Sequence, residues 1–206
     1  GSEIFKDFLK DISNRADDIR NKRVKPDQDN MLKITTDGRK AALDMRLVDL
    51  IFGRESDSKV MRCAENIADV YYDTRDTNSI QLVFCDISTP KEGFNLYDEL
   101  KSLLIAMGIP GNKIAFIHEA ENERQKEELF KELRKGEKSV LIGSTFKTGH
   151  GVNIQERLVA MHHLDVPWRP ADMVQREGRI LRRGNNSKSI KIFRYITKGS
   201  FDAYSW

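Results

Sequence analysis

Three side chains near the end of the sequence have the types and spacing expected of a phosphate-binding site. Within the stretch "DVPWRPADMVQREGRILRRGN", residues 165–185, Gln175, Arg179 and Arg182 stand at i, i+4 and i+7. In a helix, which turns by about 100° per residue, these positions share one face. A guanidinium is permanently charged and presents a planar fork of donors that suits phosphate oxygens. The spacing therefore predicts a helix face able to contact a triphosphate and to neutralise charge during phosphoryl transfer.

The same region carries a local excess of positive charge, although the net charge of the whole chain is only +3. Between residues 168 and 194 the only acidic residues are Asp172 and Glu177. The basic residues there are Arg169, Arg176, Arg179, Arg182, Arg183, Lys188, Lys191 and Arg194. Such an excess attracts phosphates. The alternative is a solvated basic face, and Arg169, Arg176 and Arg183, which have no assigned role, fit that description.

A second stretch with possible chemistry is the glycine-bearing "STFKTGHGVN", residues 144–153. Gly149 and Gly151 allow the backbone to approach a ligand closely. Ser144, Thr145 and Lys147 supply donors for a phosphate backbone. The alternative interpretation is an ordinary tight turn between a strand and a helix.

The pattern of hydrophobic residues predicts how these two stretches are positioned. Short apolar runs at 79–86, 113–118, 138–144, 159–167 and 189–197 are typical of buried strands, and helical patterns lie between them. Alternating strands and helices predict an α/β fold, a parallel sheet with helices on both faces. Both candidate stretches follow strands, and ligands of such sheets bind at the carboxyl ends of the strands.

Residues 1–76 have the character of a helical lead-in segment. Apolar spacing predicts helices over 4–20 and 58–72, and residues 21–30 read as a polar loop. Asp37 and Gly38 suggest a turn followed by a short helix.

Composition narrows the class of protein. Charged residues make up 33% and hydrophobic residues 39%, which is typical of a folded domain rather than a disordered one. No apolar run approaches the roughly 20 residues that a membrane helix needs. No signal peptide is visible, so we expect a cytoplasmic protein. Cys63 and Cys85 lack metal-ligand spacing and are expected to be buried free thiols, and no metal site is predicted. His162 and His163 lie in a predicted strand, where at least one must face inward as a core histidine.

The motif G-x-x-x-x-G-K-[ST], which cradles nucleotide phosphates in many NTPases, occurs nowhere in the sequence. No acidic pair follows a strand in the manner of a Mg²⁺-binding motif either. If the chain is part of an NTPase, the phosphate cradle and the metal site must be formed by other residues.

The motifs, taken in order, resemble a known family. The sequence reads "STFKTGHGVN", then D-x-x-W-x-P, then Q-x-x-x-R-x-x-R-x-G, the last two formed by Asp165, Trp168, Pro170, Gln175, Arg179, Arg182 and Gly184. This series is similar to motifs V and VI of superfamily-two helicases, especially Swi/Snf-type translocases of double-stranded DNA. Residues 140–206 also resemble the DarB-like proteins of phages and mobile elements, which join a helicase to a DNA methylase.

The resemblance implies that residues 77–206 are the carboxyl-terminal RecA-like lobe of an ATP-dependent DNA helicase or translocase. ATP and Mg²⁺ would be held mainly by the amino-terminal RecA-like lobe of the same protein, so this chain alone would be inactive. The partners would be double-stranded DNA, that lobe and a linked methylase domain. The implied catalytic residues are Arg179, Arg182 and Gln175; the implied ATP-binding residues are Gly149, Gly151 and Asn153; the implied DNA-binding residues are Ser144, Thr145, Lys147 and Trp168.

The sequence departs from the Swi/Snf pattern at three points. Thr148 and Gly149 stand where that group has paired glycines, Phe146 replaces a basic residue, and Asn185 replaces a glutamine. These departures bear on the DNA contacts more than on the arginines. Two other functions stay open: the lobe of an RNA helicase, and a nucleic-acid-binding module without enzymatic activity.

Overall fold

A computed structural model describes residues 2–148, 154–178, 185–187 and 189–202 of the chain. The chain forms two compact units, one made of residues 1–59 and 196–206 and the other of residues 60–195. We describe each unit by itself. None of the described helices is long and apolar enough to cross a membrane.

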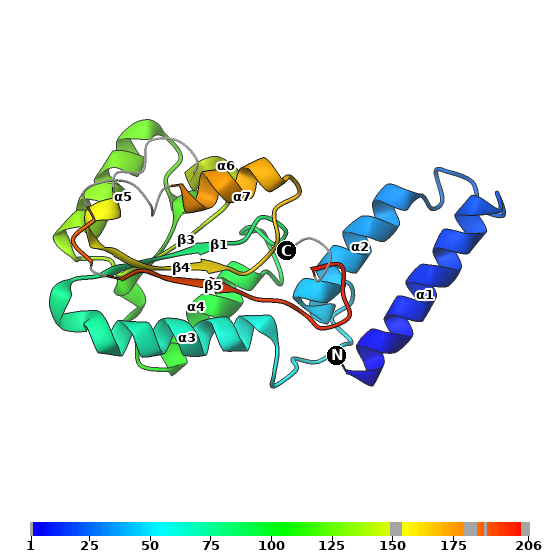
Figure 1. Ribbon diagram of the computed structural model, residues 1–206, viewed down its shortest axis with the longest axis horizontal. Coiled ribbons are helices and arrows are strands. Elements are labelled where there is room, and N and C mark those ends of the chain that lie inside the picture. Colours follow the sequence, from blue (N-terminus) through cyan, green and yellow to red (C-terminus); the bar gives the residue numbers. More distant parts are fainter. Residues whose placement is uncertain (1, 149–153, 179–184, 188, 203–206) are drawn as a thin grey trace. The chain divides into compact units, whose positions relative to one another are not determined.

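The larger unit is built on a sheet of five parallel strands (Figure 1). The strand order is β2-β3-β1-β4-β5. The strands are β1 (Ile80–Phe84), β2 (Ile114–Phe116), β3 (Val140–Gly143), β4 (Leu158–His163) and β5 (Lys191–Arg194). Every residue of β1, β2 and β3 is buried, as continuous apolar runs predict for the inside of a parallel sheet. The edge strand β5 is the exposed exception.

Helices cover both faces of this sheet (Figure 1). One face carries α3 (Lys59–Thr74) and α4 (Leu96–Ala106), and the other carries α5 (Glu123–Lys135), α6 (Thr145–Thr148) and α7 (Pro170–Glu177). Short 3₁₀ turns complete the unit at η2 (Arg75–Thr77), η3 (Gly111–Lys113), η4 (Ile117–Glu119) and η5 (Gln155–Arg157). The predicted α/β fold with helices on both faces of a parallel sheet is confirmed.

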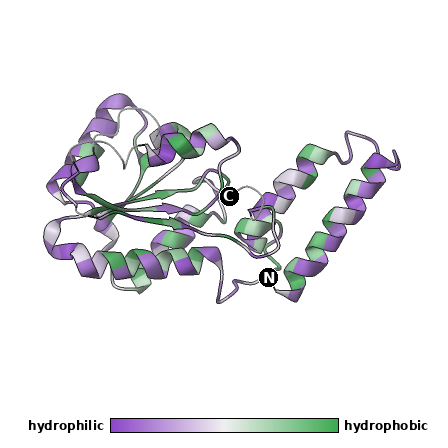
Figure 2. Ribbon diagram, in the orientation of Figure 1, coloured by the Kyte–Doolittle hydropathy of each residue, from purple (hydrophilic) through white to green (hydrophobic). Residues whose placement is uncertain are grey.

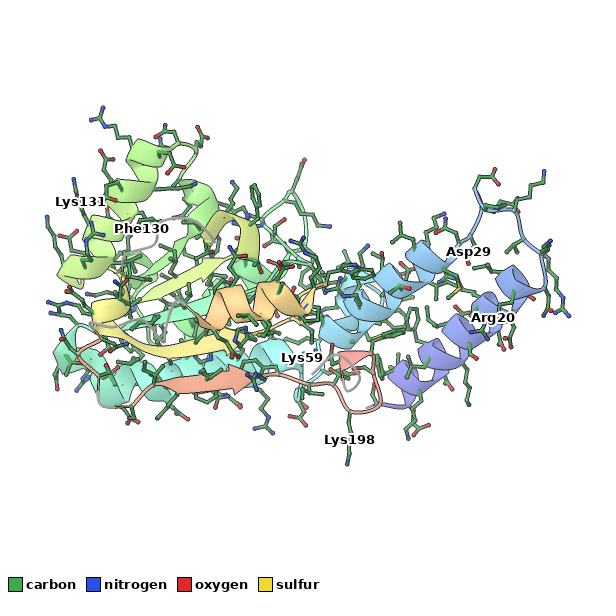
Figure 3. The ribbon with its side chains drawn as sticks, turned by 45° about the horizontal axis from the view of Figure 1, so that its top comes forward. Arg20, Asp29, Lys59, Phe130, Lys131 and Lys198 are labelled. Carbon is green, nitrogen blue, oxygen red and sulfur yellow. The ribbon has the colours of Figure 1, made fainter. Side chains whose placement is uncertain are left out.

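The core beneath α5 shows how the sequence produces this packing. Leu129, Phe130 and Leu133, spaced at i, i+1 and i+4, are buried against Leu82 and Leu141 of the sheet. Figure 3 labels Phe130 and its neighbour Lys131, which is exposed. Figure 2 shows the same separation of green and purple residues along the helices. A single apolar stripe thus fixes which side of α5 faces the strands.

The smaller unit is a pair of helices, α1 (Glu3–Arg20) and α2 (Met31–Leu43), followed by η1 (Met45–Leu47). Phe5, Ala41 and Met45 form its core. The guanidinium of Arg15 donates to Asp29 at 2.7 and 2.9 Å and to Asp37 at 3.0 Å, so it ties α1 to the loop and to α2.

The turn predicted at Asp37–Gly38 is wrong, because α2 runs through both residues. Asn30 caps the helix by accepting a hydrogen bond from the backbone N–H of Lys33 at 3.0 Å. Gly38 is buried, and a methyl group placed there would lie 3.8 Å from the Phe201 ring. Because 3.8 Å is an ordinary van der Waals distance, neither a chain reversal nor a close approach requires glycine at this position.

The units divide at a different place from the boundary expected after residue 76. Helix α3 belongs with the sheet, since the side chain of Gln81 in β1 donates to the carbonyl of Ile67 in α3 at 2.8 Å. Residues after β5 return to the smaller unit, where Thr197 donates to the carbonyl of Ala42 at 2.6 Å and Lys59 pairs with Asp202. Neither link is local in sequence, so a linear pattern could not reveal it.

Candidate functional site

The site lies where three neighbouring parallel strands end. Asp86 follows β1 by two residues, Thr145 follows β3 by two, and Asp165 follows β4 by two. Since β1 lies between β3 and β4, these side chains meet at the same edge of the sheet. This is the edge at which ligands of parallel α/β sheets bind.

Arg176 of α7 holds the cluster together. Only 1% of this residue is exposed. Its guanidinium donates to the Thr145 hydroxyl at 2.7 Å, to Asp86 at 2.7 Å, and to the carboxylate and carbonyl of Asp165 at 3.1 and 2.9 Å. It also lies over the ring of Phe84, 5.0 Å from the centroid. The interpretation of Arg176 as solvated surface charge is therefore wrong.

The two carboxylates organise the backbone around the guanidinium. Asp165 accepts hydrogen bonds from the backbone N–H groups of Asp86 and Ile87 at 2.6 and 2.7 Å. Asp86 accepts from the backbone N–H and the hydroxyl of Thr145 at 2.6 and 2.7 Å. Burial raises the pKa of Asp165, and the charge of Arg176 opposes that rise. The cluster thus joins the turn after β1, the start of α6 and α7.

Asp86 is not among the site residues that the sequence predicted. A signal for it exists, because "LVFCD" and "MHHLD" both end an apolar strand with an aspartate. Two carboxylates at the same edge of a sheet require a cation nearby, since an unpaired buried charge is costly. The pattern points to a cationic partner but does not say which of the arginines provides it.

The predicted DNA-binding residues of the glycine-bearing stretch lie together in and beside α6, but in different environments. Thr145 is 8% exposed, and its hydroxyl is shared between Asp86 and Arg176. Ser144 is equally buried, and its hydroxyl accepts from the backbone N–H of Lys147 at 3.3 Å. Lys147 is half-buried. Its positive charge adds to the effect of burial in lowering the pKa of His118.

The remaining predicted contacts lie on or near α7. Trp168 is 60% exposed in the segment before the helix, and Pro170 occupies the first helical position, which its fixed φ suits. Gln175 is exposed, next to the buried Arg176. Arg179 and Arg182, like Gly149, Gly151 and Asn153, lie outside the described residues.

The two histidines of β4 are core residues, as predicted. His162 is bonded through its ring nitrogens to the Tyr195 hydroxyl and to Gln81, both at 2.9 Å. His163 stacks on Phe84, with ring centroids 5.8 Å apart, and its Nε2 lies 3.4 Å from a carboxylate oxygen of Glu177. Burial lowers the pKa of each ring to about 3. Neither ring therefore carries a charge near neutral pH.

A pocket of about 540 Å³ lies away from this cluster, at the opposite end of the strands. It is lined by Ser79, Arg157 and Lys191 at the starts of β1, β4 and β5. Within the described part of the chain, no three His, Cys, Asp or Glu side chains gather in a way that could hold a metal ion.

The larger unit thus has the parallel α/β architecture of a RecA-like lobe, with its polar cluster at the carboxyl edge of the sheet. Residues 58–184 match the family model described as helicase conserved C-terminal domain. The chain belongs to this family, and its resemblance to the carboxyl-terminal lobes of superfamily-two helicases is confirmed.

Solved structures of low sequence identity share the fold. The C-terminal part of the Fun30 ATPase domain superposes with a TM-score of 0.55 at 19% identity, over 72% of this chain and 44% of that one. Mss116p, in a structure bound to single-stranded RNA and AMP-PNP, superposes with a TM-score of 0.50 at 20% identity, over 68% of this chain and 25% of that one.

A curated relative matches by sequence. The protein called defense against restriction protein B, from Escherichia phage P1, is 36% identical over 78 residues. The match covers 38% of this chain but spans only 3% of the length of the phage protein.

Proposed function

We propose that the chain is the carboxyl-terminal motor lobe of an ATP-dependent DNA helicase or translocase of the Swi/Snf type. The observation that carries the proposal is the position of α7. Its buried Arg176 fastens it to the carboxyl edge of the sheet, and Gln175 next to it is exposed. Arg179 and Arg182 follow in the sequence, beyond the described end of α7 at Glu177, and their role is proposed from the motif resemblance.

Within this proposal, the residues of the chain have two tasks. Arg179 and Arg182 neutralise the charge that develops on the transferred phosphoryl group, a contribution of about 10³–10⁵ in rate for an arginine finger. Gln175 aligns them, and Gly149, Gly151 and Asn153 lie beside the nucleotide. Lys147 and Ser144 contact the DNA backbone with Trp168 beside them. Thr145 acts through the cluster, because its hydroxyl is already bonded.

The fit of ATP and Mg²⁺ to this chain is partial. Asp86 and Asp165 are both bonded to Arg176, so they are poor candidates for metal ligands. The phosphate-cradling motif is missing from the sequence. We therefore assign Mg²⁺ and most of the phosphate contacts to an amino-terminal RecA-like lobe. ATP hydrolysis would supply the free energy for movement, and this chain alone would not turn over ATP.

DNA is the proposed substrate because the sequence-matched relative is named for defence against restriction, a process directed at DNA. The resemblance to DarB-like proteins extends the proposal to a methylase domain elsewhere in the same protein. The fold alone does not favour DNA over RNA, since the solved neighbours include a protein bound to single-stranded RNA.

The test measures ATP hydrolysis by the complete protein in the presence of duplex DNA or RNA. We expect duplex DNA to stimulate turnover, and Arg179→Ala to lower it by about 10³-fold or more while the Kd for DNA stays within about threefold. Arg169→Ala is the matched control, because Arg169 is exposed just before α7 and pairs with Asp172 at 3.0 Å. The control should retain turnover.

Other outcomes would contradict parts of the proposal. Stimulation by RNA and not by duplex DNA would indicate the RNA helicase lobe. A wild-type protein that binds DNA without hydrolysing ATP, and that loses DNA binding with Arg179→Ala, would be a binding module. Robust DNA-stimulated hydrolysis by the 206-residue chain would show that no second lobe is needed.

A further inference from the structure

The buried cluster connects the two surfaces to which the proposed function assigns different ligands. Helix α6 carries Lys147, assigned to the nucleic acid, and α7 carries Gln175, assigned to the nucleotide. Arg176 donates to Thr145 at the start of α6 and to Asp165 before α7. A single side chain therefore spans both elements.

The geometry makes this connection stiff. The Arg176 side chain is 0% exposed, and its donors are divided among four acceptor atoms on Asp86, Thr145 and Asp165. Charge-assisted hydrogen bonds to a buried guanidinium are strong, and separating Arg176 from Asp165, whose side chain is 1% exposed, leaves an uncompensated buried charge. A shift of α6 relative to α7 would break at least one such bond. The two helices are therefore expected to move together.

We infer that Arg176 is a positioning residue that couples nucleic-acid binding at α6 to the nucleotide-facing side of α7. This inference rests on the proposed function. Nucleic acid that displaces Lys147 and Thr145 would pull on the Arg176 guanidinium and so reorient α7. Asp86 acts as the second anchor of the link, since it bonds both Thr145 and Arg176. A purely structural role would stabilise the lobe without affecting the response to nucleic acid.

The experiment compares two conservative variants, Arg176→Lys and Asp86→Asn, in the complete protein. Arg176→Lys keeps the charge but removes the fork that reaches several acceptors. Asp86→Asn keeps the shape, and its side chain is 30% exposed in the wild type, so the change is tolerated more easily. Arg169→Lys and Asp172→Asn are matched controls, because they alter an ion pair between the exposed Arg169, which precedes α7, and the half-buried Asp172 in its first turn.

The readout is the ratio of nucleic-acid-stimulated to basal ATP turnover, measured with the Kd for the nucleic acid, the KM for ATP and the Tm. We expect both test variants to lower the ratio by about tenfold or more, within the usual range of coupling between sites, while Kd and KM change by less than about threefold. The ratio in the double variant should be no lower than in the more severe single variant, because both changes break the same link. The controls should keep the wild-type ratio.

Two results would overturn the inference. A stimulated wild type whose folded variants keep the full ratio would show that Arg176 only stabilises the lobe, and the proposed function would stand. If Arg176→Lys does not fold, Asp86→Asn decides the matter. A wild type that no nucleic acid stimulates would overturn the proposed function and this inference together.

Discussion

At the scale of single residues, the neighbourhood decides what an arginine does. Arg169 and Arg176 are seven positions apart in the same basic stretch. Arg169 is exposed just before α7 and pairs with Asp172 three residues on, whereas Arg176 is buried between Asp86 and Asp165. Burial of a guanidinium is costly unless its charge and its donors are satisfied. Two carboxylates, a hydroxyl and a backbone carbonyl accept from it here, so the buried arginine is stable.

The buried histidines of β4 predict how stability depends on pH. The pKa of each ring is about 3 in the folded chain, whereas an unfolded histidine has a pKa of about 6.5. Between these values the unfolded chain binds more protons, so the free energy of unfolding falls as the pH falls. The effect is at most about 1.4 kcal/mol per pH unit for each histidine, and it is absent above the unfolded pKa.

Urea denaturation at several pH values between about 5.5 and 7.5 measures this dependence in a range above ordinary carboxyl titration. We expect the slope below pH 6.5 to be smaller in His162→Gln than in the wild type, although the variant is less stable overall. A slope unchanged by the substitution would show that His162 does not titrate as burial requires.

At the scale of elements, capping and packing override a local turn signal. The sequence of α2 contains Asp-Gly, a common turn pair, yet the helix continues because Asn30 caps its start and Ala41 and Leu43 are buried. By contrast, Gly136 ends α5 with φ of 78°, where an L side chain is strained. Gly38 therefore lies inside a continuing helix, whereas Gly136 ends one.

This contrast gives a matched pair of substitutions. Gly38→Ala should stabilise its unit by about 0.5–1 kcal/mol, because alanine is the better helix former and its methyl group fits at 3.8 Å from Phe201. Gly136→Ala should destabilise by more than about 1 kcal/mol, because its methyl group would lie 2.5 Å from the Cβ of Asn78. Chemical denaturation followed by circular dichroism measures both changes. Two changes of the same sign would contradict the assignment.

At the scale of the whole molecule, the two thiols report on unfolding. Cys63 in α3 and Cys85 after β1 are both 0% exposed. Burial raises the pKa of both thiols, and that of Cys63 reaches about 12. Neither is therefore a reactive thiolate in the folded state.

We expect alkylation of both cysteines to be negligible in native buffer and to appear together as urea unfolds the larger unit. Peptide mass mapping after a short exposure to iodoacetamide distinguishes the two sites. Fast labelling of one thiol in native buffer would show local opening of the helix or strand that carries it.

The sequence predicted the elements because their signals are local. A buried run such as Ile80–Phe84 or an apolar stripe such as that of α5 is visible within one segment, and the alternation of such segments defines a parallel α/β sheet. The sequence predicted less about which elements pack together into one compact unit. The association of α3 with the sheet and the return of residues 196–202 to the helical unit rest on contacts such as Thr197 to Ala42, which are 155 residues apart.

By itself, therefore, the sequence determined the fold class and the helicase family, and it showed that both candidate stretches follow strands. Only the tertiary structure decided that Arg176 is a buried link between α6 and α7. Its partner Asp86 is 90 residues away in the chain, and the charge pattern of residues 168–194 does not distinguish one arginine from another. The choice depends on which side of the helix faces the ends of β1, β3 and β4, and packing in three dimensions sets that side.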